Sequence, residues 1–302
     1  MKVGSFSCIP GWIPLIAALS LPQQTANTSR LGDPAALVRK TVENEIKTNH
    51  QDIRFMFRGT KTTPKGSVTK LYVETKEATT GIVVAYDGKP LTPEQKRAEQ
   101  ERVERFIRNP EELKKKQKQE QEDTERTVRI VRAIPDAFLF EYDGQESGTA
   151  ELGKPEDPLV RLKFRPNPNY QPPSRVEQVL RGMQGVLLID AVGDRIAKID
   201  GELFKDVTFG WGILGHLDKG GHFEIRQRAI GDDRWEICRM DLHFTGKVLL
   251  VKSLTIDSTD VYGDYKQVPA DLSFALGVEM LKRAQEQFVA AGGTAKGKSD
   301  SP

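Results

Sequence analysis

The stretch from Phe209 to Ile225, FGWGILGHLDKGGHFEI, combines residue types that build phosphate loops and metal sites. It contains five glycines, and His216, Asp218 and His222 lie close together in it, with His243 further along the chain as a candidate fourth ligand. Histidine nitrogens and carboxylate oxygens are common ligands of zinc in proteins. A hydrolase or metal enzyme is therefore one hypothesis for this stretch.

The surrounding pattern favours a structural interpretation of the same residues. A P-loop needs Gly-Lys-Ser/Thr and a helix after its glycines. Here DKGG, residues 218–221, leads into HFEIRQRAI, which alternates apolar and polar residues as a strand does. We therefore predict two strands joined by a turn, as in a hairpin, with glycines that supply positive φ.

No other pattern in the chain indicates catalysis. The sequence lacks a G-x-S-x-G nucleophile elbow. Cys238 lies in RWEICRM, where alternation predicts a buried or half-buried strand residue rather than a reactive thiolate. The whole chain has four histidines, which leaves few agents for general acid–base chemistry. We expect a protein that is not an enzyme and that uses no cofactor and no metal.

The N-terminal residues predict the cellular compartment. Lys2 is the only charged residue before Arg30, and the apolar run IPGWIPLIAALSLP occupies residues 9–22. A cationic start followed by a short apolar run is typical of a secretory signal peptide. The run is interrupted by prolines and is shorter than the about 20 apolar residues that a membrane-spanning helix needs. We predict a signal peptide over residues 1–29, an exported protein of the periplasm or cell envelope, and no transmembrane span after cleavage. Retention as an N-terminal anchor is the alternative.

Charge and cysteine content limit the partners of the exported chain. Residues 1–29 include Lys2 and no acid, so their removal lowers the formal charge from +2 to +1. A nearly neutral chain provides no overall field to attract nucleic acid, and we expect no nucleic-acid partner. If Cys8 leaves with the signal peptide, Cys238 has no intrachain disulfide partner.

The periodicity of apolar residues predicts helices at both ends and strands between them. Asp33 and Pro34 form a helix start, and the helix should end near His50. A short helix is expected over 174–182 and a final helix over 269–290, followed by a disordered tail over 291–302. Period-two alternation and turn residues predict strands over 52–59, 67–75, 81–88, 160–165, 185–190, 196–204, 207–214, 222–230, 234–246 and 250–257.

Residues 92–133 have a different character. Thr92 and Pro93 form a helix start, and the residues from Glu94 to Arg126 include ten basic and ten acidic side chains. Many of them are spaced for ion pairs along a helix surface, and Pro110 divides the segment. We predict an inserted helical hairpin. It is either a solvated excursion or an arm that docks on an envelope protein partner.

These elements lack the alternation of strands and helices that a parallel sheet requires. We predict an α+β fold, mainly antiparallel β, in which a strongly curved half-barrel sheet of about ten strands carries flanking helices and the inserted charged helical hairpin. Residues 30–290 should form a single domain. About three amphipathic helices are too few to cover one face of such a sheet, and wide antiparallel sheets coil. A concave apolar groove, the usual form of a lipophilic ligand site, should remain.

The clearest alternations nominate the residues that line this groove, although each could be an ordinary core residue. The predicted lining is Phe55, Phe57, Leu71, Val73, Leu162, Phe164, Phe209, Trp211, Phe223 and Ile225.

The strand ladder GVLLIDAVGDRIAKIDGELF, continued by GGHFEIRQRAIGDDRWEICRMDLHFTGKVLLVKSLTI, resembles the periplasmic lipoprotein-carrier (LolA/LolB-like) superfamily. The resemblance covers residues 31–90 and 136–268. The chain is also similar to exported bacterial proteins without an assigned activity that share FGWGILGHLDKGG. The resemblance implies an unfinished barrel, closed by helices over a cavity that takes acyl chains, and it brings no catalytic motif.

Two functions follow as hypotheses. The first is a non-enzymatic extracytoplasmic protein that binds a lipid or an acylated protein in the apolar cavity of the half-barrel. The second is a cell-envelope scaffold or interaction module that uses the helical insertion over 92–133 and binds no ligand.

Overall fold

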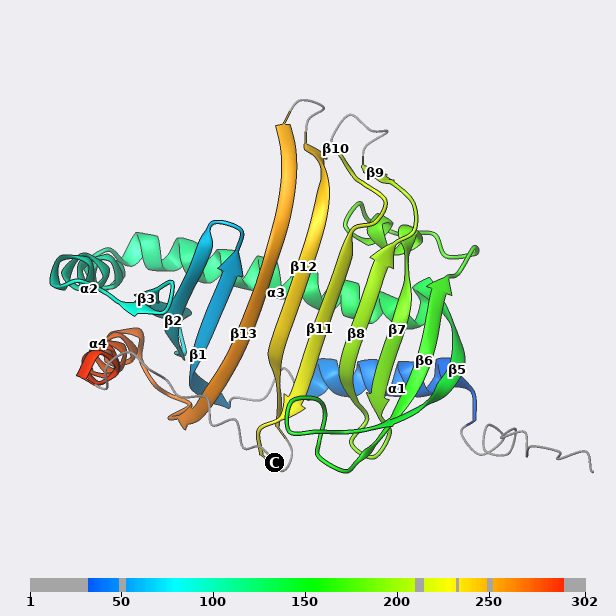
Figure 1. Cartoon of the computed structure of the whole chain (residues 1–302), viewed down its shortest axis with the longest axis horizontal. Coiled ribbons are helices and arrows are strands. Elements are labelled where there is room, and N and C mark those ends of the chain that lie inside the picture. The colour runs from blue at the N-terminus through cyan, green and yellow to red at the C-terminus, as the bar shows by residue number, and fades with distance from the viewer. Residues whose placement is uncertain (1–31, 49–52, 210–214, 232–233, 249–251, 291–302) are drawn as a thin grey trace, which may run out of the picture. The chain divides into compact units, whose positions relative to one another are not determined.

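One curved antiparallel sheet organises the protein (Figure 1). The computed structural model describes residues 32–48, 53–209, 215–231, 234–248 and 252–290. The predicted signal peptide and C-terminal tail therefore lie outside the described residues. The strands are β1 (Arg54–Thr63), β2 (Gly66–Glu74), β3 (Thr79–Tyr86), β4 (Lys89–Pro90), β5 (Phe138–Ser147), β6 (Pro158–Pro166), β7 (Met183–Asp190), β8 (Arg195–Leu203), β9 (Val207–Phe209), β10 (Gly215–Leu217), β11 (His222–Ala229), β12 (Trp235–Val248) and β13 (Lys252–Val268).

The sheet is mainly antiparallel and open, which confirms the predicted fold class. Its strand order is β4-β3-β2-β1-β13-β12-β11-β8-β7-β6-β5, and the short strands β9 and β10 attach beside β12. The two edges do not pair with each other, so the sheet is an unclosed, curved layer. The described residues form 13 strands where about ten were predicted. The difference arises partly from the very short strands β4, β9 and β10.

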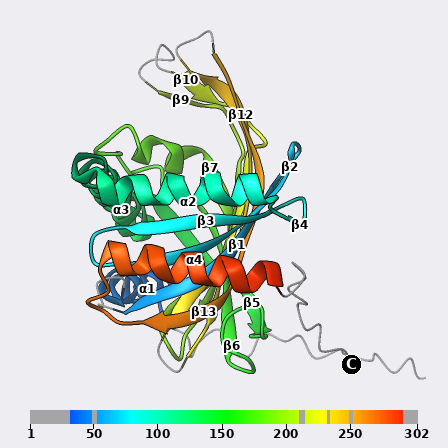
Figure 2. The ribbon, with the colours of Figure 1, turned by 90° about the vertical axis from the view of Figure 1, so that its left-hand side faces the viewer.

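Helices flank this sheet. They are α1 (Pro34–Thr48), α2 (Pro93–Arg108), α3 (Pro110–Ala137), the short 3-10 helix η2 (Glu177–Gly182) and α4 (Phe274–Ala290). In Figure 2, α1 and α3 lie to one side of the tall strands β12 and β13, whereas α2 and α4 run across the β3 end of the sheet. Helix α3 passes behind the strands in Figure 1, from the side of β3 to the opposite edge at β5. It therefore extends across the hollow face of the sheet.

The predicted insertion is a pair of helices with defined starts. Thr92 and Gln95 form a capping box at the beginning of α2, and Asn109 caps the first turn of α3. The insertion was predicted to end at residue 133, but α3 continues through Pro135 to Ala137. The helix persists because Ile134 and Ala137 are buried, and a proline so close to the C-terminal end breaks little of the helix.

Side chains from the helices cover the outer edge of β3. An exposed strand edge presents unpaired N–H and C=O groups to other chains, which natural proteins avoid. The contacts are Glu120 with Thr79 N–H at 2.9 Å, Glu99 with Val83 N–H at 3.2 Å, Arg102 with Gly81 C=O at 2.6 Å, and Gln285 with Val83 C=O at 2.7 Å. The insertion is therefore part of the edge of the sheet as well as a link between strands.

The hydrophobic core has two parts. One is a cluster formed by the β1–β3 end of the sheet with α2 and α4, and it includes Val73, Ile82, Val103, Val278 and Leu281, all fully buried. The other surrounds Leu159, Leu188 and Ala197 at the β6–β8 end. The cavity described below lies at the same end of the sheet but on the opposite face, which carries Leu187 of β7 rather than Leu188.

The glycine-rich stretch differs from the predicted hairpin. The turn is present, with Gly220 at φ +85°, but the chain does not reverse there. Strands β10 and β11 both pair with β12, Leu217 opposite Gly246 and His222 opposite His243. The four residues of the turn therefore face two residues of β12, as in a large β-bulge. The reversal comes earlier, where Phe209 pairs with Gly215 around residues 210–214, which lie outside the described part.

Candidate functional site: an apolar cavity under helix α3

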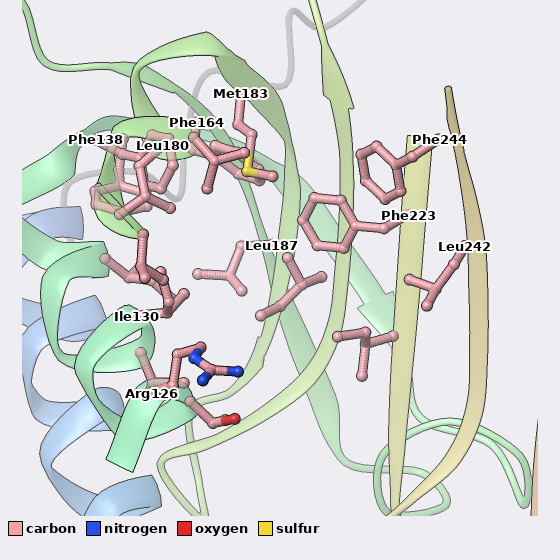
Figure 3. Close-up of a pocket in the computed structure, with 18 residues that line it drawn as sticks. Arg126, Ile130, Phe138, Phe164, Leu180, Met183, Leu187, Phe223, Leu242 and Phe244 are labelled. Atoms are coloured by element: carbon pink, nitrogen blue, oxygen red, sulfur yellow. The ribbon is translucent and has the colours of Figure 1, made fainter. Parts of the chain in front are cut away.

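A cavity of about 410 Å³ lies between α3, η2 and the hollow face of the sheet (Figure 3). In Figure 3, Ile130 of α3 and Leu187, Phe223 and Leu242 of the sheet surround the same space. The volume falls within the range of about 300–1,000 Å³ that is typical of small-molecule sites. Of its lining residues, only Arg126 carries a formal charge.

The floor of the cavity is a patch of alternating residues on neighbouring strands. Phe223 pairs with Leu242 and Ile225 pairs with Met240 across β11 and β12, so their side chains share one face. The rings of Phe223 and Phe244 stack with centroids 6.4 Å apart and an interplanar angle of 22°. The floor residues are Leu187, Ile199, Phe223, Ile225, Leu242 and Phe244.

Two glycines shape this floor, Gly201 of β8 and Gly221 directly before β11. A Cβ atom on Gly201 would lie 2.5 Å from the ring of Phe223, and one on Gly221 would lie 2.5 Å from the ring of Phe244. Glycine in a strand commonly marks such a close approach. The Phe223 ring lies against the backbone of Gly201, and the Phe244 ring lies against that of Gly221. A larger residue at either glycine would clash with the ring.

Helix α3 forms the roof. Ile130, Val131 and Ile134 recur at helical spacing and face the cavity, with Thr127 one turn earlier. The lining prediction did not include them, because it used strand alternation alone. A sequence signal existed: after Arg126 the acidic residues stop until Asp136, and apolar residues recur every three or four positions. The second half of the charged segment is therefore amphipathic.

The remaining wall comes from η2 and from an aromatic group near the β5 edge. Phe138 lies 4.8 Å from Phe164 between ring centroids, and both line the cavity. Leu180 and Met183 contribute from η2 and the start of β7. The sequence placed a short helix here but gave no reason to assign one of its faces to a cavity.

Arg126 is the charged residue of the lining. Its side chain is about half exposed and donates from Nη1 to Asp123 Oδ1 at 3.0 Å. An exposed guanidinium whose stem lies against apolar side chains keeps its charge in water. Arg126 therefore marks the mouth of the cavity.

A smaller cavity of about 260 Å³ continues under α3 toward α1 and shares Thr127, Val131, Ile199 and Ile225 with the first. Its far end is polar. Glu45 of α1 accepts from Arg195 Nε and Nη2 through its two carboxylate oxygens, each at 3.0 Å, in an ion pair that is nearly buried. The apolar space thus ends at fixed, paired charges.

A second ion pair lines the same polar end. Arg234 and Glu236 approach to 2.6 Å. Burial raises the pKa of Glu236, because the charge and hydrogen bond of Arg234 offset only part of the desolvation. The Glu236 carboxylate is thus part of an ion pair with Arg234.

The structure brings three of the ten predicted lining residues together around the cavity: Phe164, Phe223 and Ile225. Leu162 is fully buried and pairs with Leu187 of β7. Phe209 is half-buried on β9, away from the lining. Trp211 lies outside the described residues.

The other four predicted residues belong to the β1–β2 end of the sheet. Leu71 and Val73 pack in the core cluster with α4. Phe57 stacks between Tyr72 and Tyr265, at 5.1 Å from each, and Phe55 meets Tyr265 edge-on. Contact with a ligand stays a prediction for all ten residues.

The three histidines in the described part of the chain each lie beside a different carboxylate rather than in a common site. His216 lies 3.0 Å from Asp218, His222 lies 3.0 Å from Asp200, and His243 is 3.8 Å from a third carboxylate, that of Asp257. Over the described ranges, no group of three His, Cys, Asp or Glu side chains is placed to hold a metal ion. Cys238 is buried, and burial raises the pKa of its thiol.

No helix among the described residues has the length and apolar character needed to cross a membrane.

The chain has distant likenesses among solved structures, including two that extend over most of its length. One is to an outer membrane lipoprotein-sorting protein domain from Vibrio parahaemolyticus, at 9% identity and a TM-score of 0.27, covering 82% of this chain and 100% of that one. The other is to a DUF1329 family protein from Desulfovibrio piger, also at 9% identity and a TM-score of 0.27, covering 82% of this chain and 99% of that one. No family model and no curated protein matches the chain. Likenesses this distant do not assign the chain to either group.

Proposed function

We propose that this protein is a non-enzymatic extracytoplasmic protein that binds an acyl chain, of a lipid or of an acylated protein, in the cavity under α3. The observation that carries the proposal is the chemistry of the lining. A cavity of about 410 Å³ with one charged lining residue favours an apolar guest. The described residues that line this cavity include no pair of side chains that could act as acid and base on a bound substrate.

The energetics of burial favour this guest. Each methylene group removed from water contributes about 0.8 kcal/mol, so ten buried carbons contribute about 8 kcal/mol before ordering costs. Strands β8, β11 and β12 provide a continuous apolar surface along which an extended chain can lie, and α3 covers it from the other side. A straight hydrocarbon chain fits such a groove better than a compact polar metabolite does.

The test is lipid content after purification. The full chain is expressed, purified and extracted into organic solvent, and the extract is analysed by mass spectrometry. We expect acyl lipid to accompany the wild-type protein and to be depleted in Ile225→Trp, which fills the cavity. Val261→Trp is the matched control, because Val261 is exposed on the opposite face of the sheet and the substitution adds a similar volume.

Two results would contradict the proposal. One is a wild-type protein that is repeatedly empty, and the other is equal lipid content in Ile225→Trp and the control. Thermal unfolding of each variant checks that Ile225→Trp remains folded, and Leu242→Trp provides a second filled cavity if it does not. The envelope-scaffold function with 92–133 as a docking arm stays a prediction.

A further inference from the structure

A second, polar pocket of about 490 Å³ lies beside η2. It is formed by residues at both ends of η2 and by residues 205–208, which lead from β8 into β9. Three of its side chains are cationic, Arg175, Arg181 and Lys205, and one is acidic, Asp206.

The three cations are exposed. Within the part of the chain that the structure describes, Arg175, Arg181 and Lys205 form no ion pair. Lys205 Nζ instead lies 5.2 Å from the centroid of the Phe204 ring. Asp206 is engaged elsewhere, because its Oδ1 accepts the backbone N–H of Lys219 at 2.7 Å. Most charged side chains of α2 and α3, by contrast, lie in ion pairs, as Arg102 does with Glu99 and Lys116 with Glu120. Among the described residues, the positive charge of this pocket is therefore not balanced by ion pairs.

Helix η2 separates the polar pocket from the apolar cavity. Leu180 and Met183 line the cavity, whereas Arg181 and Gly182, between them in sequence, line the polar pocket. The one acid of η2, Glu177, lines neither of these two pockets and faces a different one beside α3. The two sites therefore lie on different sides of one short helix.

The position of η2 is fixed by close packing against β9. A Cβ atom on Gly182 would lie 2.4 Å from a methyl group of Val207, and the Gly182 carbonyl accepts the N–H of Phe204 at 3.0 Å. These contacts fix the backbone that carries Arg181 against the segment that carries Lys205.

We infer that the ligand is an amphiphile with an anionic, phosphate-type headgroup, bound by Arg175, Arg181 and Lys205 while its acyl chain lies in the cavity. This inference rests on the proposed function and narrows the class of lipid. The arginine fork matches phosphate oxygens in pairs, and lysine adds a point charge. A zwitterionic headgroup places a second, positive group in the same pocket and gains less from it.

The test compares two lysolipids with the same acyl chain, the anionic lysophosphatidylglycerol and the zwitterionic lysophosphatidylcholine. Each is titrated into the full chain, stripped of lipid, below its critical micelle concentration in a calorimeter. We expect the wild type to prefer the anionic lipid by about tenfold at low salt, and the preference to fall at high salt. The variant R175Q/R181Q/K205Q should lose the preference and keep its affinity for lysophosphatidylcholine.

The control variant K65Q/K89Q/K154Q removes the same charge at exposed lysines that line neither site, and it should bind as the wild type does. The inference is overturned if both triple variants lose the preference equally, or if R126Q alone abolishes it. Tight binding of glycerol phosphate alone would also overturn it, because the ligand would then be a free phosphate ester. If the wild type binds both lysolipids with equal affinity, only this inference is contradicted. If it binds neither lysolipid, the proposed function is contradicted as well.

Discussion

At the residue scale, the nearly buried ion pair of Glu45 and Arg195 joins α1 to the sheet at the polar end of the groove. Glu45 binds Arg195 through both oxygens and also accepts the N–H of Ile196 at 2.8 Å. The Arg195 guanidinium lies 5.8 Å from the Trp235 ring centroid. These contacts fix α1 on β8, so they set the depth of the space between α1, α3 and the sheet.

Removing one partner of this pair should be costly. We expect Glu45→Ala to lower the free energy of unfolding by about 3–5 kcal/mol, because Arg195 would remain buried without its hydrogen-bonded carboxylate partner. Urea denaturation measures the effect. Arg39→Ala, which breaks the exposed pair of Arg39 with Asp136, is the control and should cost less than about 1 kcal/mol. A loss for Glu45→Ala no larger than that of the control would contradict the assignment.

At the element scale, the inserted helices have two separate tasks. Helix α2 covers the edge of β3 through Glu99 and Arg102, and the second half of α3 roofs the cavity. The charge balance of residues 92–133 predicted neither task, because a sequence pattern shows which residues can pair along a helix but not which strand edge lies beside it. Only the tertiary arrangement joins Glu99 to Val83.

The edge seal should depend on pH. Burial alone would raise the pKa of Glu99, but hydrogen bonds from Arg102 and from the Val83 N–H outweigh it and hold the pKa below its ordinary value of 4.5. A carboxyl whose pKa is lowered by folding stabilises the protein above pH 4.5 and loses that contribution as the pH falls below it. We expect Glu99→Gln to cost about 0.5–1.5 kcal/mol at pH 7 and progressively less between pH 4.5 and 3.

The comparison uses urea denaturation at each pH. Glu101→Gln on the same helix is the matched control, because the exposed Glu101 has no hydrogen bond or ion pair among the residues described. A Glu99→Gln difference that stays constant down to pH 3, or one equal to that of Glu101→Gln, would show that the ionised carboxylate does not seal the edge.

Strand boundaries show where sequence reasoning succeeded and where it failed. Alternation located most strands, since burial of one face imposes period two, as in β6, where Leu162 and Phe164 are buried and Lys163 is exposed. It ended β13 too early, at Asp257, because the following residues are polar. Ser258 and Asp260 are nevertheless buried in the strand, where Lys61 of β1 donates to Ser258 Oγ and Asp260 Oδ2 at 3.2 and 3.1 Å. A cross-strand cation cannot be foreseen from one strand alone.

At the scale of the whole sheet, the hollow face is divided by chemistry. Its β6–β12 part carries the apolar floor, whereas its β1–β13 part carries a group of tyrosines beside Asp260, where burial raises the pKa of Tyr262 to about 12. We predicted that the helices would be too few to cover one face of the sheet. In the structure, α3 crosses the hollow face and leaves a cavity beneath it. The sequence could not say which part of the sheet would stay open, since both ends carry alternating aromatic residues.

The most direct measurement is photo-crosslinking with a fatty acid that carries a diazirine near the end of its chain. The acid is bound to the lipid-free full chain, irradiated, and located by peptide mass spectrometry. We expect adducts on peptides that contain Ile130, Phe223 or Leu242, and their loss in Ile225→Trp. Adducts on the opposite face of the sheet, near Val261, or a pattern unchanged by Ile225→Trp, would show that the cavity under α3 is not where an acyl chain binds.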